Sequence, residues 1–173
     1  GKTPSRYNRN HKVAGIAGWT QHVATQEEVA AWSKDPDYGI CIQTRTVRAI
    51  DIDVEDVDVV QDIVEEIGGQ LHWLCLPMRT RPNSSKCLLL FQYTGELPKR
   101  ILRLANGIIE LLGTGQQFVA CGTHTSGVRY EWITPEGEAG LPDNIPSLSL
   151  KEVDALWSAL EARFAVAPST TSN

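Results

Sequence analysis

The sequence of 173 residues lacks the features that define several large classes of protein. No apolar run approaches the roughly 20 residues that a membrane-spanning helix needs, and neither an internal repeat nor the Gly-Lys-Ser/Thr of a phosphate-binding P-loop is present. The four cysteines are widely spaced and form neither a Cys-x-x-Cys pair nor a Cys/His cluster with the spacing of a zinc site. We therefore expect reduced thiols, no bound zinc and a cytoplasmic location.

The chain also lacks an excess of positive charge. Its net charge of −5 argues against a protein that coats nucleic acid through generic, salt-dependent contacts. The charges are nevertheless segregated along the sequence. Acidic residues crowd positions 51–66, whereas Arg79, Arg81 and Lys86 form a basic stretch that contains no acid. An enzyme that acts on nucleic acid is therefore compatible with the composition.

An apolar strand that carries two acids is the most informative feature that is present. In a strand, Ile50, Ile52 and Val54 would share one face, and Asp51 and Asp53 would share the other. Two neighbouring carboxylates repel each other unless a cation neutralises them. Because Mg²⁺ is usually held by one or two carboxylates together with substrate phosphates, the pattern predicts metal-assisted chemistry on a phosphate.

The remaining patterns predict the secondary structure. Apolar residues at helical spacing follow the acidic strand over residues 55–67, and Gly68-Gly69 is expected to end that helix. Capping boxes that begin at Thr25 and Ser149 predict helices up to residues 33 and 164. A short basic helix is expected over residues 97–104, and strands over residues 38–43, 47–53, 72–79, 87–91, 107–112, 117–121 and 128–133.

These elements predict an α+β fold whose second half is mostly antiparallel. Residues 1–18 and 134–146 are expected to be loops. One domain is expected over residues 1–165, built from two small modules, and residues 166–173 are expected to be a disordered tail or a linker to a further domain.

A third unusual acid, Glu110, interrupts the apolar run over residues 107–112. It would complete a three-carboxylate site with Asp51 and Asp53. Two metal ions held by such a site can activate a 3′-hydroxyl and stabilise a leaving pyrophosphate. The alternative is that Glu110 lies on the solvent face of an edge strand.

The basic stretch is a candidate site for phosphates. Arg79 and Arg81 would point to one face of a strand, and the turn that follows carries Ser85 and Lys86. Guanidinium, ammonium, hydroxyl and backbone N–H groups together suit a triphosphate, although a solvated hairpin tip is the alternative. His124 lies in a glycine-flanked loop, where it could contact a phosphate or a base or could be an exposed histidine without a role.

Taken together, these residues resemble the three-motif order of the archaeo-eukaryotic primase superfamily, and most closely its prim-pol branch, the N-terminal domains of bifunctional DNA primase/polymerases of phages and plasmids. The first motif is Asp51-Ile52-Asp53, the second falls at residues 85–88, and the third is Ile109-Glu110. Residues 113–132 are similar to the segment after the third motif in phage members, and residues 18–40 resemble the usual lead-in. The order and spacing of the motifs carry the resemblance.

The resemblance implies a fold, an activity and a set of partners. The fold would join a small α/β module to a module like an RNA-recognition motif, with the active site in the cleft between them. The activity would be template-directed transfer of NTPs or dNTPs on single-stranded DNA with a primer. Further along the polypeptide a helicase domain is expected, and the cytoplasm would be that of a bacterial host if a phage or plasmid encodes the protein.

The resemblance also implies roles for individual residues. Asp51, Asp53 and Glu110 would bind two Mg²⁺ or Mn²⁺ ions. Many members have a histidine that contacts the nucleotide's phosphates where Cys87 stands here. We therefore expect Lys86, helped by Arg79 or Arg81, to hold the triphosphate, and we include Ser85 and His124 in the nucleotide site.

Three other functions use similar residues. A metal-dependent nuclease also needs clustered acids, but the third strand offers no Glu-x-Lys. A glycosyltransferase uses Asp-x-Asp, but the chain is short for one. A catalytically inactive module that binds single-stranded DNA during replication initiation would use aromatic stacking platforms, whereas the tryptophans here are scattered and are expected in the core: Trp19, Trp32, Trp73, Trp132 and Trp157.

Overall fold

The computed structural model describes residues 4–36, 38–72, 75–133, 140 and 142–166. The chain forms, in order, β1 (Ser5–Tyr7), β2 (Val13–Gly15), α1 (Gln26–Trp32), β3 (Ile40–Gln43), β4 (Val47–Val54), α2 (Val57–Gln70), β5 (Met78–Thr80), β6 (Cys87–Gln92), β7 (Arg100–Leu104), β8 (Gly107–Leu112), β9 (Gln117–Cys121), β10 (Glu131–Ile133) and α3 (Leu150–Phe164). The expected α+β class is confirmed.

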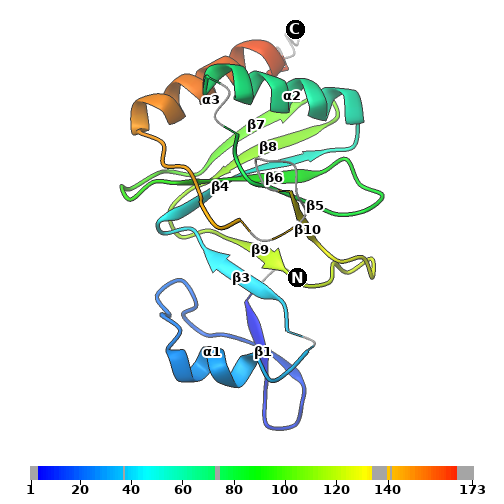
Figure 1. Ribbon diagram of the computed structural model, residues 1–173, viewed down its shortest axis with the longest axis vertical. Coiled ribbons are helices and arrows are strands. Elements are labelled where there is room, and N and C mark those ends of the chain that lie inside the picture. The colour runs from blue at the N-terminus through cyan, green and yellow to red at the C-terminus, as the bar shows by residue number, and fades with distance from the viewer. Residues whose placement is uncertain (1–3, 37, 73–74, 134–139, 141, 167–173) are drawn as a thin grey trace, which may run out of the picture.

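A six-stranded antiparallel sheet, in the order β10-β5-β6-β4-β8-β7, forms the centre of the fold. Helices α2 and α3 cover one face of this sheet, and the two-stranded ribbon of β3 and β9 lies on the other side (Figure 1). The β1–β2 hairpin and α1 lie beyond the ribbon, at the opposite end of the molecule from α2 and α3 (Figure 1). The structure is therefore layered around the central sheet.

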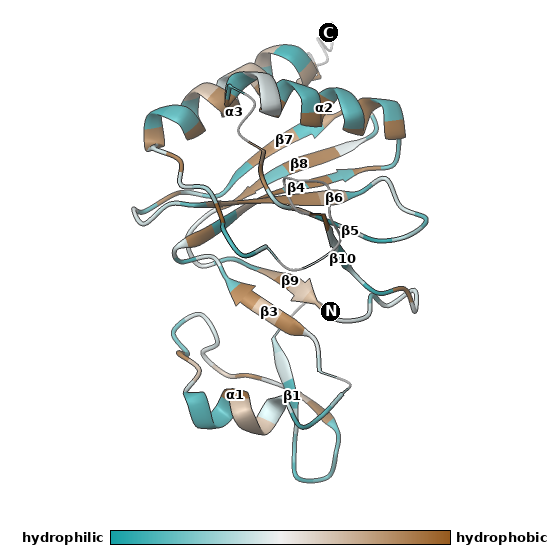
Figure 2. Ribbon diagram, in the orientation of Figure 1, coloured by the Kyte–Doolittle hydropathy of each residue, from teal (hydrophilic) through white to brown (hydrophobic). Residues whose placement is uncertain are grey.

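Two apolar clusters hold the layers together. The cluster between the sheet and the helices includes Ile50 and Ile52 from β4 and Ile63 from α2, which are 0–1% exposed. The cluster on the other face joins the sheet to the ribbon, through residues such as Leu88 of β6 and Phe118 of β9. Figure 2 shows the same division, because α2 and α3 each carry a hydrophobic and a hydrophilic side. Each fully buried aliphatic side chain contributes about 1.5–3 kcal/mol to this packing.

Several predicted elements have the expected bounds. Strands β8 and β9 begin and end at the predicted residues, and both capping boxes are present, at Thr25 and Ser149. Helix α2 continues through Gly68 and Gly69 to Gln70, so the predicted helix end was about one turn too early. The predicted N-terminal loop contains the β1–β2 hairpin.

The helix expected over residues 97–104 was wrong. Residues 100–104 form β7, which pairs with β8 through a turn at Ala105 and Asn106. Along β7, Leu102 is buried while Ile101 and Arg103 are exposed, which is the alternation of a strand that covers one side of a sheet. Consequently β8 lies between β4 and β7, and Glu110 is not on an edge strand.

Two other strands are shorter than expected. Of residues 72–79 only 78 and 79 belong to a strand, β5, while residues 73 and 74 lie outside the described part of the chain. Of residues 128–133 only the last three form β10. Most of the loop expected over 134–146 and, except for Val166, the tail expected over 166–173 also lie outside the described residues. No helix in the described part of the chain combines the length and the apolar character that crossing a membrane requires.

Gly107 lets β8 begin directly against the end of β4. Its φ is +153°, and an added Cβ would lie 2.3 Å from the carbonyl oxygen of Asp53. We expect Gly107→Ala to lower the free energy of unfolding by about 2 kcal/mol or more, because backbone strain and overpacking both oppose it. Gly69→Ala in α2 is the control, since nothing lies within 4 Å of its added Cβ, and it should raise stability by up to about 1 kcal/mol. Urea denaturation measures both changes, and similar effects of the two substitutions would contradict this account.

Candidate active site

The two aspartates of β4 lie on the face of the sheet away from the helices. Ile50, Ile52 and Val54 are buried beneath α2 and α3, so alternation turns Asp51 and Asp53 to the other face. The side chain of Asp53 is 44% exposed. The aspartates thus stand in the centre of the sheet but remain accessible.

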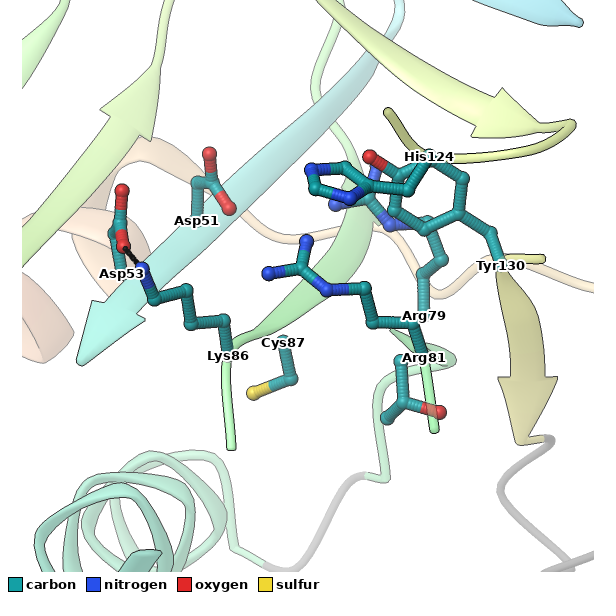
Figure 3. Close-up of a pocket in the computed structure, with 9 residues that line it drawn as sticks. Asp51, Asp53, Arg79, Arg81, Lys86, Cys87, His124 and Tyr130 are labelled. Atoms are coloured by element: carbon teal, nitrogen blue, oxygen red, sulfur yellow. Dashed lines mark ion pairs between the residues drawn. The ribbon is translucent and has the colours of Figure 1, made fainter. Parts of the chain in front are cut away.

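These aspartates open into a cavity of about 120 Å³. Figure 3 shows Asp51 and Asp53 on one side of it, with His124 and Tyr130 on the other. The cavity forms where β4, β5 and the start of β6 meet the loop between β9 and β10. Its lining residues combine carboxylates with cations and aromatic groups: Asp51, Asp53, Arg79, Thr80, Arg81, Lys86, Cys87, His124 and Tyr130.

Lys86 neutralises the acidic side of the cavity. Its Nζ lies 2.8 Å from Oδ1 of Asp53 and 2.6 Å from Oε1 of Glu55. The hydrogen bonds to Asp53 and then to Glu55 raise the pKa of the Lys86 ammonium, which therefore stays charged at neutral pH. The neighbouring Ser85 does not line the cavity, because its hydroxyl donates to the carbonyl oxygens of Val54 (2.7 Å) and Glu55 (2.9 Å). Ser85 therefore anchors the turn that carries Lys86, and its contact with a nucleotide stays a prediction.

Arg79 is the cation that the fold buries most deeply in this site. Its guanidinium donates to the carbonyl of Val119 in β9 and lies 4.3 Å from the centre of the Tyr130 ring. Burial lowers the pKa of Arg79, while the charge of Asp51 and then Tyr130 oppose that shift. The Nε of Arg79 is buried and has no hydrogen-bond partner among the described residues. An orphaned guanidinium donor inside a cavity is suited to a phosphate oxygen.

His124 is oriented by its own loop. Its Nδ1 lies 2.8 Å from the hydroxyl of Ser126 and accepts the Ser126 backbone N–H at 3.1 Å, so Nδ1 is engaged within the loop. The ring meets Tyr130 edge to face, with 5.9 Å between the ring centres. The backbone N–H of Gly127, where φ is +84°, closes the turn on the His124 carbonyl at 2.8 Å. His124 is thus held at the cavity wall.

Glu110 is close to the aspartates in the sheet but is engaged elsewhere. It stands directly opposite Asp51 in the β4–β8 register, and opposite residues of neighbouring strands share a face. Its side chain is 20% exposed and its Oε1 lies 2.6 Å from Nζ of Lys99. It does not line the cavity, and within the described ranges no three His, Cys, Asp or Glu side chains are gathered as metal ligands. The structure therefore brings Asp51 and Asp53 together and leaves Glu110 beside them, paired with a lysine.

The donor set of the cavity fits a hard divalent cation. Asp51 and Asp53 supply carboxylate oxygens, and Mg²⁺ is usually bound by one or two carboxylates with the rest of its shell from water and phosphate. The cavity also contains no thiolate that would favour a softer metal, because Cys87 is kept protonated by its surroundings.

Cys87 belongs to the core rather than to the phosphate side of the cavity. It is opposite Ile52 in the β4–β6 register and packs in the cluster beneath the helices, 3% exposed. Burial, with a smaller effect of the Asp51 charge, raises the pKa of the Cys87 thiol to about 12. Cys87 therefore cannot make the phosphate contact that a histidine would make.

Two residues with a clear role in this geometry were not predicted as site residues, Tyr130 and Lys99. Tyr130 stacks on Arg79, and Lys99 pairs with Glu110. The signal for Lys99 was the hairpin of β7 and β8, in which Ile101 stands opposite Glu110. Assigning residues 97–104 to a helix hid that pairing. No comparable sequence signal identifies Tyr130.

Paired aspartates that face cations across one cavity are the composition expected of a site for a phosphorylated substrate. Residues 1–148 match the family model for the bifunctional DNA primase/polymerase N-terminal domain, and the chain belongs to that family. The protein is therefore a DNA primase/polymerase-type domain, of the nucleotidyltransferase class, with DNA and nucleotides as substrates. The resemblance inferred from the three motifs is confirmed, and no match to the chain was found among curated proteins or solved structures.

The environment of Cys87 can be tested by its reactivity. Exposed Cys75 should be alkylated by iodoacetamide in the native protein at mildly alkaline pH. Cys87 should stay unmodified until the protein is unfolded, because it is buried and its pKa of about 12 keeps the thiolate fraction very small. Mass spectrometry of the digested protein measures both sites. Modification of Cys87 at the rate of Cys75 would show that β6 does not hold the thiol in the core.

Proposed function

We propose that this domain is a template-directed DNA primase and DNA polymerase, which joins NTPs or dNTPs on single-stranded DNA, in a phage or plasmid replication protein. The observation that carries the proposal is the shared cavity, which Asp51 and Asp53 line together with the cations Arg79, Arg81 and Lys86. Carboxylates for a cation and donors for phosphates are the two halves of a nucleotidyl-transfer site. Family membership supports the same reaction class.

In the proposed reaction, the 3′-hydroxyl oxygen of a primer or first nucleotide attacks the α-phosphorus of the incoming nucleotide. A new phosphodiester bond forms as the hydroxyl proton is lost to water, the bond from the α-phosphorus to the bridging oxygen breaks, and pyrophosphate leaves with that electron pair. Asp51 and Asp53 would hold Mg²⁺ or Mn²⁺, which supplies charge for the phosphates and activates the hydroxyl. Arg79 and Arg81 would bind the β- and γ-phosphates, and His124 would contact the nucleotide from the opposite wall of the cavity.

Lys86 would exchange one anion for another during this cycle. Without nucleotide it neutralises Asp53 and Glu55. A divalent cation on Asp53 would repel the ammonium, and the nearest alternative anion would be the triphosphate. This exchange reconciles the expected role of Lys86 in nucleotide binding with its position on the acids.

Glu110 would join the site by the same kind of exchange. Glu110 stands opposite Asp51, within reach of the aspartates. Lys99 would pair with Glu110 for as long as no shared cation is bound. We propose that Glu110 completes the carboxylate set when substrate is bound.

Carboxylate substitution tests the proposed function. We expect Asp51→Asn and Asp53→Asn each to lower primer extension on single-stranded DNA with Mn²⁺ and dNTPs by roughly 100-fold or more, because each removes a cation ligand. Asp62→Asn is the matched control, since Asp62 is an exposed aspartate of α2 whose ion pair is with Arg163. Electrophoresis of labelled DNA measures the products.

The same gel separates the competing activities. Shortened DNA without dNTPs would indicate a nuclease. Absence of product from the parent protein, with unchanged DNA binding by both aspartate variants, would indicate an inactive binding module and contradict the proposal.

A substitution of Lys86 separates its two proposed roles. Lys86→Gln removes the charge that occupies Asp53, so Mn²⁺ should bind the nucleotide-free protein several-fold more tightly. The same variant should bind dNTP about tenfold more weakly, because one phosphate contact is lost. Calorimetry measures both affinities, and Lys151→Gln on the exposed surface of α3 is the control. Changes of the same sign in both affinities would refute the exchange.

A further inference from the structure

The N-terminal module, residues 4–43, is packed differently from the rest of the fold. None of its described residues is buried, and α1 contributes none to either core cluster. It nevertheless encloses an apolar cavity of about 540 Å³, within the roughly 300–1,000 Å³ of typical ligand sites. Figure 2 shows that β3, which forms one wall, is hydrophobic except at its last residue, Gln43. The lining includes Ile16, Trp19, Val29, Trp32, Ile40 and Cys41.

Two tryptophans of the module share this cavity. Trp19 and Trp32 are half-buried and both line it, although they are 13 positions apart in the sequence. Trp132 and Trp157 lie in the core as predicted, and Trp73 lies outside the described residues. The prediction of a core position was therefore wrong for Trp19 and Trp32. Partly exposed tryptophans in one cavity offer flat surfaces on which nucleobases stack.

The charge of the module complements a phosphate backbone. Residues 1–45 contain six Lys or Arg and four Asp or Glu, whereas residues 46–173 contain ten and 17. Arg6, Arg9 and Lys12 are exposed and form no ion pair with a carboxylate in the described part of the chain, and Arg6 also lines the cavity.

Two acids of the module contact its histidines. Glu28 lies 3.2 Å from His22, and Asp35, which also lines the cavity, lies 3.6 Å from His11. Exposed Arg6 at the cavity, and exposed Arg9 and Lys12 in the same hairpin, remain available to an anionic ligand.

We propose that the N-terminal module binds the single-stranded DNA template, with a nucleobase in the cavity that Trp19 and Trp32 line and the adjacent phosphates on Arg6, Arg9 and Lys12. The proposal rests on the proposed function and assigns its template strand to a place on the chain. A purely apolar occupant would not account for these cations, which form no ion pair with a carboxylate in the described part of the chain. A nucleic acid without sequence preference uses both features, since every base has a π-face and every nucleotide a phosphate.

The ribbon connects this cavity to the candidate active site. Cys41 of β3 lines the apolar cavity and pairs with Val119 of β9, whose carbonyl accepts from Arg79. The loop that follows β9 carries His124. A template bound on the module would therefore be held by an element that also forms part of the nucleotide cavity.

Fluorescence anisotropy of a labelled oligothymidine, titrated with the 173-residue protein, tests the proposal. We expect Trp32→Ala to weaken binding at least about fivefold, and Trp32→Phe to retain most of it because a ring remains. Arg6→Gln should lower the slope of log affinity against log salt by roughly 0.7, whereas the control Lys151→Gln should leave it unchanged. Affinity for dNTP should be unchanged in every one of these variants.

The outcomes distinguish this proposal from the proposed function. If the parent protein extends primers but Trp32→Ala and Arg6→Gln bind DNA normally, the template lies elsewhere and the proposal is wrong. If no variant of the protein extends primers but DNA binding still depends on Trp32 and Arg6, the DNA site stands and only the polymerase function fails. If light scattering reveals a dimer, and Trp32→Ala converts it to a monomer without loss of DNA affinity, a second copy of the chain occupies the cavity and the proposal is wrong. Should Trp32→Ala lower the melting temperature, exposed Arg6 provides the test that does not depend on packing.

Discussion

The position of β4 in the centre of the sheet is the constraint on which the site depends. Its neighbours β6 and β8 fix its register on both sides, and three aliphatic side chains bury one face beneath α2 and α3. A slip of one residue would expose Ile50, Ile52 and Val54 and bury two carboxylates, at a cost of several kcal/mol. The apolar packing therefore dictates that Asp51 and Asp53 face the opposite side together.

Placing acids in the centre of a sheet creates a charge that the fold balances with its own cations. Lys86 neutralises Asp53 and Lys99 neutralises Glu110, while half-buried Arg79 lies near the charge of Asp51. Each lysine has a flexible stem and can leave its acid without disturbing the backbone. Arg79 is instead fixed by Tyr130 and by the carbonyl of Val119. The site thus combines exchangeable cations with one fixed cation.

How much the sequence reveals depends on how local the signal is. The alternation in β4, the helical spacing in α2 and the capping box at Ser149 lie within a few residues, and these elements were predicted. The helix expected at Pro98 failed because the strand β7 is set by its pairing with β8, which local propensity does not encode.

The same distinction applies to the candidate sites. Asp51 and Asp53 stand out as acids in an apolar strand, and the cations of the cavity lie in one short stretch. The pairing of Glu110 with Lys99, and the position of Trp19 and Trp32 on one cavity, depend on tertiary contacts that join separate segments. The ribbon is the clearest example. A two-stranded ribbon is marginally stable alone. Here Phe118 packs in the apolar cluster between the ribbon and the sheet. Buried Thr44 adds two hydrogen bonds, because its hydroxyl donates to the Gly113 carbonyl and accepts the Gln116 N–H at 3.0 Å. Because one wall of each cavity comes from this ribbon or from the loop beside it, the packing of the ribbon on the sheet sets the geometry between the two cavities.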